Sequence, residues 1–321
     1  MMQSTLRARL SVVAEFPEHF FLENIAVRGD NSLLVTVANR RELYYVPPPR
    51  EASTVAPLLL HRFGELAAGI AEFDPDLFAV LTGNVYTTHD NYLHRLDLRG
   101  WRPGMPATPE RILAFPQAML GANGCCAASS RTLFAADTFG GAIWRIDVGG
   151  DGHVDTQLWL KHASMAHVKD KLPPPPQPGI NGLRYSARTH HLYYTTTGQK
   201  LFMRVGLDPV THEPAGAPEQ VAGGGMYDDF CIDDARGRAY LTVHRENRID
   251  CVSLDPAGPA PHAVAGDALD PILLGPSSAA WSRVPAEEGR IIFVTSDGGH
   301  TAPPPDGHVR TAKVLRLELI E

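Results

Sequence analysis

Four oxygen-bearing side chains open four short apolar segments that are far apart in the chain. Glu23 opens ENIAV, Asn123 opens NGCCA, Asn181 opens NGLRY and Asp228 opens DDFCI. Carboxylate and amide oxygens suit Ca²⁺, Mg²⁺, Mn²⁺ or Zn²⁺, with water completing the coordination. These residues form one metal site only if the fold brings the starts of the segments together. The alternative is that Asn and Asp stand there because both favour the turns that precede strands.

A sequence repeat predicts the elements that would position these side chains. Six apolar middle segments, each typical of a buried strand, recur along the chain: SLLVTV, LFAVLT, TLFAAD, HLYYTT, RAYLTV and RIIFVT. Shorter apolar segments precede them and begin near residues 23, 68, 123, 181, 228 and 277. The spacing averages about 51 residues, which is typical of a four-stranded propeller blade.

The number of strands in the repeats predicts how the ring closes. Third strands follow all six middle segments, but fourth strands follow only the first five. The N-terminal segment RLSVVAEF (9–16) is available to pair with VLRLEL, the last third strand, and such pairing removes the exposed edges of an open sheet. We therefore predict an all-β fold: a single six-bladed β-propeller domain over residues 1–321, with four-stranded blades and a ring closed by the N-terminal strand.

The composition limits the partners of the protein. With 44% hydrophobic residues, 20% charged residues, 29 Gly and 27 Pro, the chain is globular and rich in turns. A net charge of −7 without a Lys/Arg-rich run argues against nucleic acid as a partner. Four cysteines are too few for a disulfide framework and fit small buried side chains.

The apolar runs of the chain bear on its location. None reaches 18 residues, and the first 16 residues lack the apolar core of a signal peptide. We expect no membrane partner and a cytoplasmic location, with a leader removed from a longer precursor as the open alternative. The sequence does not indicate an oligomeric state.

One connection between blades is long and proline-rich, at residues 162–179 (HASMAHVKDKLPPPPQPG). Consecutive prolines favour an extended path and do not join a central ladder. The connection leads into the inner strand of the fourth blade. In a propeller, such a connection reaches one end of the central channel, which we call the mouth. We expect a lid over the pocket, with a surface insertion without function as the alternative.

Loops between second and third strands are expected to reach the same mouth and, with Asn123, to bind a small organic substrate. Their polar residues are Asn39, Arg40, Asn84, His89, Asp137, Thr197, His244 and His300. The aromatic residues Tyr86, Phe139, Tyr227 and Trp281 are similarly placed and suit an apolar or planar ligand. Each of these residues alone also fits an ordinary role, in a solvated loop or, for Trp281, in packing within the blades.

ENIAV, the two Asn-Gly steps and DDFCID resemble the senescence-marker-protein/gluconolactonase/luciferin-regenerating-enzyme family, and the resemblance spans essentially all six blades. Members of this family are six-bladed propellers that hold a divalent cation in the channel. The resemblance implies that Glu23, Asn181 and Asp228 are metal ligands. It also implies that Asn123 contacts the substrate.

Two features depart from the family pattern. Its Glu-Gly-Pro is Glu23-Asn24-Ile25 here, and its Asp-Gly is Asp228-Asp229, which changes backbone freedom and charge beside the expected ligands. FLENIAVR, DDFCID and the proline-rich connection are more similar to the fungal branch of the family. That branch includes proteins of natural-product pathways, and some propellers of this kind are cofactor-free hetero-Diels–Alder cyclases.

Three functions are compatible with these features. The first is metal-assisted hydrolysis of a lactone or similar ester, with a divalent cation polarising the carbonyl and Asp228 as the catalytic proton acceptor. The second is a cyclase of polyketide or terpenoid biosynthesis that needs no cofactor and works by orienting its substrate. The third is a non-catalytic propeller that binds another protein. No Gly-x-Ser-x-Gly, phosphate-loop or dinucleotide motif supports another enzyme class.

Overall fold

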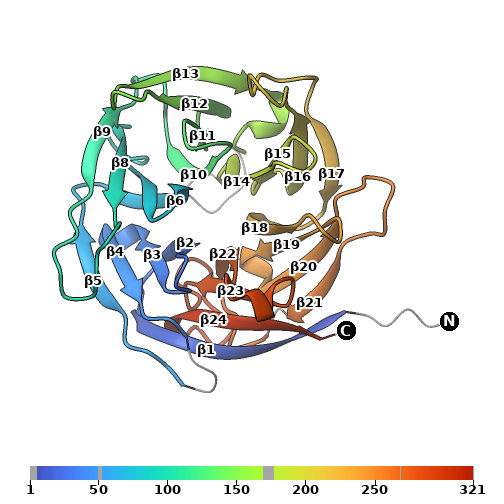
Figure 1. Ribbon diagram of the computed structural model, residues 1–321. Coiled ribbons are helices and arrows are strands. Elements are labelled where there is room, and N and C mark those ends of the chain that lie inside the picture. The colour runs from blue at the N-terminus through green and yellow to red at the C-terminus, as the bar shows by residue number, and fades with distance from the viewer. Residues whose placement is uncertain (1–5, 50–52, 169–176, 268, 321) are drawn as a thin grey trace.

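The computed structural model describes residues 6–49, 53–168, 177–267 and 269–320. Their strands form six antiparallel sheets of four strands, which stand as blades around a central axis (Figure 1). The predicted six-bladed β-propeller is therefore confirmed. The described part of the chain holds no helix with the length and apolar character needed to cross a bilayer.

The blades are numbered in chain order, and their strands are given from the axis outward. Blades one to three are β2 (Leu22–Val27), β3 (Leu33–Val37), β4 (Glu42–Val46), β5 (Leu58–Arg62); β6 (Leu66–Asp74), β7 (Leu77–Gly83), β8 (Asn91–Asp97), β9 (Glu110–Ala114); and β10 (Ala122–Ala127), β11 (Thr132–Asp137), β12 (Ala142–Val148), β13 (Val154–Lys161). Blades four to six are β14 (Ile180–Ser186), β15 (His191–Thr196), β16 (Leu201–Gly206), β17 (Glu219–Gly223); β18 (Tyr227–Asp233), β19 (Arg238–Val243), β20 (Arg248–Ser253), β21 (His262–Gly266); and β22 (Pro276–Trp281), β23 (Ile291–Ser296), β24 (Thr311–Ile320), β1 (Arg7–Glu18). Short 3-10 turns lie at η1 (Ala38–Arg40), η2 (Ala163–Met165), η3 (His244–Glu246) and η4 (Pro285–Glu287).

The ring closes as the sequence predicts. β1 pairs with β24 in antiparallel register, from Arg7 opposite Ile320 to Glu18 opposite Thr311. The strand is longer than the predicted 9–16 by two residues at each end. The sixth blade therefore combines segments from opposite ends of the described chain (Figure 1).

The core consists of six apolar clusters, each between two neighbouring blades. The alternation of side chains along each strand sends apolar residues to both faces of a blade, as expected for strands covered on two sides. All four cysteines are buried and free, and they belong to these clusters.

A bulge near the start of every inner strand determines which residues reach the channel mouth. In blade five, Asp228 and Asp229 together face Thr242, because the register shifts between Tyr227 and Phe230. The Thr242 hydroxyl accepts the Asp229 N–H at 3.0 Å and donates to the Ser277 carbonyl of the next blade at 3.0 Å. Corresponding threonines hold the bulges of blades one, four and six: Thr36, Thr195 and Thr295. The bulge thus positions two successive inner-strand residues near the axis instead of one.

Gly124, the second residue of an Asn-Gly step, lies where the inner strands of blades three and four meet. A Cβ atom at this position would lie 2.4 Å from the backbone carbonyl oxygen of Asn181. We expect Gly124→Ala to lower the free energy of unfolding by about 1–3 kcal/mol, measured from the midpoint of chemical unfolding. Gly216→Ala is the control, because its added Cβ would meet nothing within 4 Å and should leave the midpoint unchanged or slightly higher. Equal midpoints for the two variants would contradict the steric explanation.

Candidate functional site

A cavity of about 510 Å³ lies where the inner strands begin, and residues of all six blades line it. Five of the six residues predicted to open the inner strands are in its wall: Glu23, Ala68, Asn123, Asn181 and Asp228. The sixth, Ser277, is buried outside the lining, where its hydroxyl donates to the Leu22 carbonyl at 2.5 Å. The fold therefore brings the four predicted oxygen-bearing side chains into one cavity.

The two carboxyl groups in the wall, Glu23 and Asp228, keep their protons to a higher pH than ordinary carboxyl groups do. Burial raises the pKa of Glu23 to about 8, and the charge of Asp228 adds to the increase. Burial also raises the pKa of Asp228 to about 7, although the charge of His244 acts in the opposite direction. Full ionisation of the pair is therefore unfavourable unless a positive charge joins it.

Asn181 fixes the orientation of Asp228. Its amide Nδ2 donates to Asp228 Oδ1 at 2.5 Å and to Thr197 Oγ1 at 2.9 Å. Both amide hydrogens are then engaged, so Oδ1 of Asn181 is the atom that can accept or coordinate. Asn123 offers a second amide oxygen, because its Oδ1 is buried without a hydrogen-bond partner among the described residues.

These groups fit the divalent cation that the family resemblance implies. Carboxylate and amide oxygens are ligands for hard cations. A buried oxygen without a protein partner is usually bound by a ligand, an ion or water. Within the described ranges, no group of three or more His, Cys, Asp or Glu side chains is arranged to hold a metal ion. A cation here would therefore depend on two carboxylates, amide oxygens and water.

A buried polar network lies one residue further along the inner strands. Asp229 Oδ2 accepts hydrogen bonds from Arg184 Nη2 at 2.6 Å, Ser278 Oγ at 2.6 Å and Asn24 Nδ2 at 3.2 Å. These donors come from blades four, six and one, so the network ties blade five to three others across the axis. Asn24 and Asp229, which replace small residues of the family pattern, bond to each other, and Arg184 offsets the added charge.

A second polar cluster lies between blades five and six. His244 Nε2 lies 3.3 Å from Asp297 Oδ2 and 3.4 Å from Thr301 Oγ1, and both His244 and Thr301 line the cavity. Burial alone would lower the pKa of His244, but the hydrogen bond to Asp297 and its charge raise it. Burial acts to raise the pKa of Asp297, yet His244 and Thr301 lower it overall. His244, whose pKa is raised, therefore lines the same cavity as the carboxyl groups of Glu23 and Asp228.

Aromatic and polar side chains form the wall on the side of blades two to four. The rings of Tyr86 and Phe139 meet edge to face, with centroids 5.8 Å apart. Beside them, Thr138 Oγ1 and Gln177 Oε1 are buried without hydrogen-bond partners in the described residues. This wall can contact apolar and polar parts of one ligand. The predicted residues Asn39 and His300 also line the cavity, with Asn39 Nδ2 3.4 Å from His300 Nε2.

Four of the loop residues predicted to bind substrate lie outside the cavity lining: Arg40, Asn84, His89 and Asp137. The Arg40 guanidinium lies 5.3 Å from the Phe20 ring centroid. The Asn84 carbonyl accepts the Thr87 N–H at 3.0 Å and the His89 N–H at 3.1 Å, and His89 Nδ1 lies 2.8 Å from the Leu120 carbonyl oxygen. These residues shape the loops, as does Asp137, whose carboxylate accepts the N–H groups of Leu120, Gly121 and Gly140.

Two predicted aromatic residues also lie outside the lining. Tyr227 is fully buried in the apolar cluster between blades four and five. Trp281 packs edge to face against Tyr240 at 5.5 Å and donates Nε1–H to the Ile232 carbonyl at 2.7 Å. Both residues serve the packing of the blades.

The predicted lid, residues 162–179, is described only in part, because 169–176 lie outside the described residues. Val168 and Gln177 form an antiparallel bridge, and Gln177 and Pro178 line the cavity. The end of the segment that enters blade four therefore contacts the candidate site.

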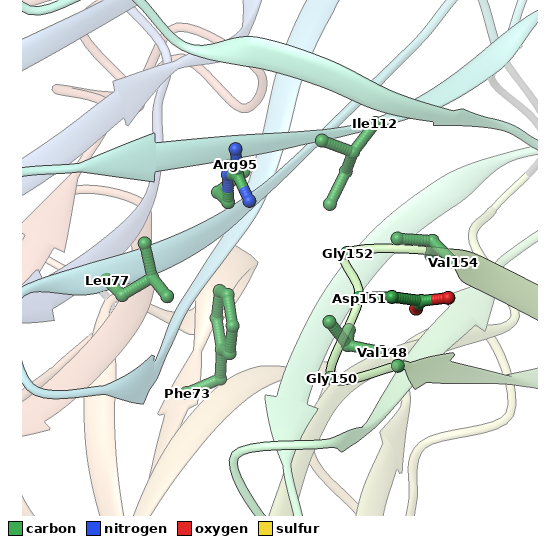
Figure 2. A pocket seen from close by; sticks show the side chains of 10 residues that line it. Phe73, Leu77, Arg95, Ile112, Val148, Gly150, Asp151, Gly152 and Val154 are labelled. Carbon is green, nitrogen blue, oxygen red and sulfur yellow. The ribbon is translucent and has the colours of Figure 1, made fainter.

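A second hollow of about 340 Å³ lies between blades two and three, toward the opposite ends of their inner strands. Figure 2 shows its apolar walls, which include Phe73, Leu77 and Ile112. Two charged residues line it and both have partners: Arg95 pairs with Glu110 at 2.5 Å, and Asp151 Oδ1 accepts the His153 N–H at 3.1 Å. The axial cavity, with its carboxyl groups and free amide oxygens, is therefore the candidate functional site.

Several cavity residues were not predicted, and a positional signal that Thr197 and His244 share could have found two of them, Ala38 and Thr138. The residue directly after the second strand occupies an equivalent place in five blades, where its N–H donates to the segment before or at the start of the inner strand: Ala38, Thr138, Thr197, His244 and Asp297. Four of these five line the cavity and Asp297 supports the fourth, His244. Arg245 and Phe21 also line it, without a repeat signal of this kind.

The fold and the site define a six-bladed propeller with an acidic, oxygen-rich axial cavity. No protein-family model and no curated protein sequence matches the chain. Among solved structures, it is similar to a luciferin-regenerating enzyme, with a TM-score of 0.66, 16% identity, and coverage of 97% of this chain and 95% of the other. A gluconolactonase from Xanthomonas campestris has a TM-score of 0.65 and 14% identity, with 98% and 90% covered. Regucalcin, a calcium-binding protein from Agrobacterium tumefaciens, has a TM-score of 0.61 and 14% identity, with 96% and 93% covered. At such low identities, the structural similarity shows a shared fold alone.

Proposed function

We propose that this protein is an enzyme that hydrolyses a lactone or similar ester of a small organic molecule, assisted by a divalent cation. The observation that carries the proposal is the pair of carboxyl groups in the cavity wall, the partly buried Glu23 and the buried Asp228, beside the available amide oxygens of Asn181 and Asn123. The similarity to a gluconolactonase and to a calcium-binding protein supports it.

The residues that carry the proposal each have a role in this reaction. Glu23, Asn181 and Asp228 would hold the cation, which when bound would supply a positive charge that polarises the ester carbonyl. Asn181 holds Asp228 through Oδ1, so Oδ2 is the atom that accepts the proton of the attacking water. Asn123 Oδ1 accepts a hydrogen bond from the substrate. Tyr86 and Phe139 hold the apolar part of the substrate against the cavity wall.

The test combines metal analysis with hydrolysis of a lactone panel by protein purified without chelator. We expect about one bound divalent cation per chain, loss of hydrolysis in EDTA and recovery when Ca²⁺, Mg²⁺, Mn²⁺ or Zn²⁺ is returned. Full hydrolytic activity in EDTA, with no bound metal, would overturn the proposal.

The affinity for the cation should depend on pH. Glu23 and Asp228 keep their protons to a higher pH than free carboxyl groups do, so a cation must displace these protons to bind. Calorimetric titration with Ca²⁺ is therefore expected to show tighter binding as the pH rises from 6 to about 8, with a plateau above. In Glu23→Gln the remaining slope should be smaller, since one of the two protons is gone. An affinity that is independent of pH would contradict this description of the site.

A second function, cofactor-free hetero-Diels–Alder cyclisation in a natural-product pathway of fungal type, is favoured by the Tyr86–Phe139 wall. Such a reaction needs an enclosed pocket that orients the substrate, and it needs no cation. An activity on a polyketide or terpenoid precursor that survives EDTA but is lost in Phe139→Ala would support the cyclase over the hydrolase.

A further inference from the structure

The pair of His244 and Asp297 has no role in the reaction steps given above, although it adjoins the same cavity. His244 directly follows β19 and Asp297 directly follows β23, so neighbouring blades present them at equivalent positions. The His244 N–H donates to the Met226 carbonyl at 3.2 Å, and the Asp297 N–H donates to the Gly275 carbonyl at 2.9 Å. Two fixed backbone positions therefore set the distance between the side chains.

The Asp297 carboxylate is fully buried and held on both oxygens. Oδ1 accepts the Gly299 N–H at 2.8 Å, and Oδ2 accepts the Thr301 N–H at 3.1 Å and the Thr301 hydroxyl at 2.8 Å. A carboxylate fixed in this way orients the imidazole that donates to it. His244 Nε2 takes that bond, so Nδ1 is the ring nitrogen that remains for a ligand in the cavity.

His244 also lies close to the proposed proton acceptor. Tyr227 stands opposite Val243, and the bulge of Asp228 and Asp229 stands opposite Thr242, so Asp228 and His244 are diagonal neighbours across the strand pair, and both line the cavity. The charge of Asp228 acts directly on His244. The mouth of the cavity thus holds one group that can take a proton and a neighbouring group that can give one.

We propose that His244 donates the proton to the leaving oxygen during ester hydrolysis, and that Asp297 is a positioning residue for His244; this inference rests on the function proposed above. Water attacks the carbonyl carbon, and its proton passes to Asp228. The bond between carbonyl carbon and ester oxygen breaks, and the leaving oxygen takes the Nδ1 proton of His244, which keeps its Nε2 proton on Asp297. The products are an acid and an alcohol, in one molecule for a lactone, and solvent returns the proton from Asp228 to His244.

The test uses two substrates that differ in their need for a proton donor. An aliphatic δ-lactone releases a basic alkoxide, whereas 4-nitrophenyl acetate releases a phenolate that leaves without protonation. We expect His244→Ala to lower kcat/KM for the lactone by about 10²-fold or more and to change it far less for the aryl ester. Asp297→Asn should show the same bias toward the aryl ester, because it disturbs the orientation of the imidazole. His308→Ala, at an exposed histidine of blade six, is the control and should leave both rates unchanged.

The outcomes separate this inference from the proposed function. A wild-type protein that hydrolyses neither substrate overturns both. A wild-type protein that hydrolyses both, together with a His244→Ala variant that loses both equally or neither, overturns the role of His244 alone. His244→Gln serves as the second variant if His244→Ala does not fold, and the expected bias is the same. Partial rescue of lactone hydrolysis in His244→Ala by added imidazole would support proton donation over a structural role.

Discussion

Asp229→Ala is expected to lower the free energy of unfolding by about 3–5 kcal/mol, because it leaves Arg184, whose side chain is only 21% exposed, without its carboxylate. The side chain of Asp229 is 2% exposed, and three donors from three other blades converge on its Oδ2. Chemical unfolding monitored by tryptophan fluorescence measures the loss. The variant loses both a charge partner and the contacts that join the blades across the axis.

Two controls separate this effect from the loss of any ion pair. Glu110→Ala removes the exposed pair of Glu110 with Arg95 and should cost no more than about 1 kcal/mol. The double variant Arg184→Met, Asp229→Asn removes both charges and keeps an acceptor for Asn24 and Ser278, so it should be more stable than Asp229→Ala. If Asp229→Ala were no less stable than Glu110→Ala, the axial network would not hold the blades together.

Asp228→Asn and Glu23→Gln are expected to lower kcat for hydrolysis by about 10²–10⁴-fold, because each removes a carboxylate proposed to hold the cation and, for Asp228, the proton acceptor. Stability should change in the opposite direction when EDTA is present. Because the pKa of each carboxyl group is raised in the folded protein, each group favours folding at low pH. The free energy of unfolding therefore falls as the pH rises, and the loss is complete above about 7 to 8. A neutral amide removes this loss.

The measurement for this second prediction is a pair of readouts at pH 8.5: the rate with cation and the melting temperature in EDTA. Glu23→Gln should be nearly inactive yet melt at or above the wild-type temperature. Glu18→Gln, at an exposed carboxylate of β1, should change neither readout. Retained activity in both site variants would remove the two carboxylates from the mechanism.

The blade architecture could be predicted from the sequence because burial on both faces gives every middle strand a continuous apolar run. The closing strand could be predicted by counting strands, because the sixth blade lacked a fourth strand and the segment RLSVVAEF could supply it. The carboxylates and amides of the cavity followed from equivalent positions at the starts of the inner strands. Each of these inferences used a local pattern that repeats.

Contacts between blades could not be predicted in the same way. The bond between Asn24 and Asp229 joins residues 205 positions apart, and no pairing rule connects them. The bulge also decides which of two neighbouring residues reaches the cavity: Asp228 lines it, whereas Tyr227 packs in the core. His244 was predicted to face the mouth, but its partner Asp297 depends on the loop geometry of the next blade.

The pairing of β1 with β24 has a consequence for how the chain reaches its folded state. The contact between Arg9 and Glu318 spans 309 residues, so the sixth blade has a very high contact order. During synthesis from the N-terminus, blades one to five leave the ribosome before β24 is made, so β1 has no partner strand during that time. β24 is synthesised after every other strand of the ring and lies between β1 and β23, so a chain released before β24 is made would leave the edges of both strands unpaired and open to other chains.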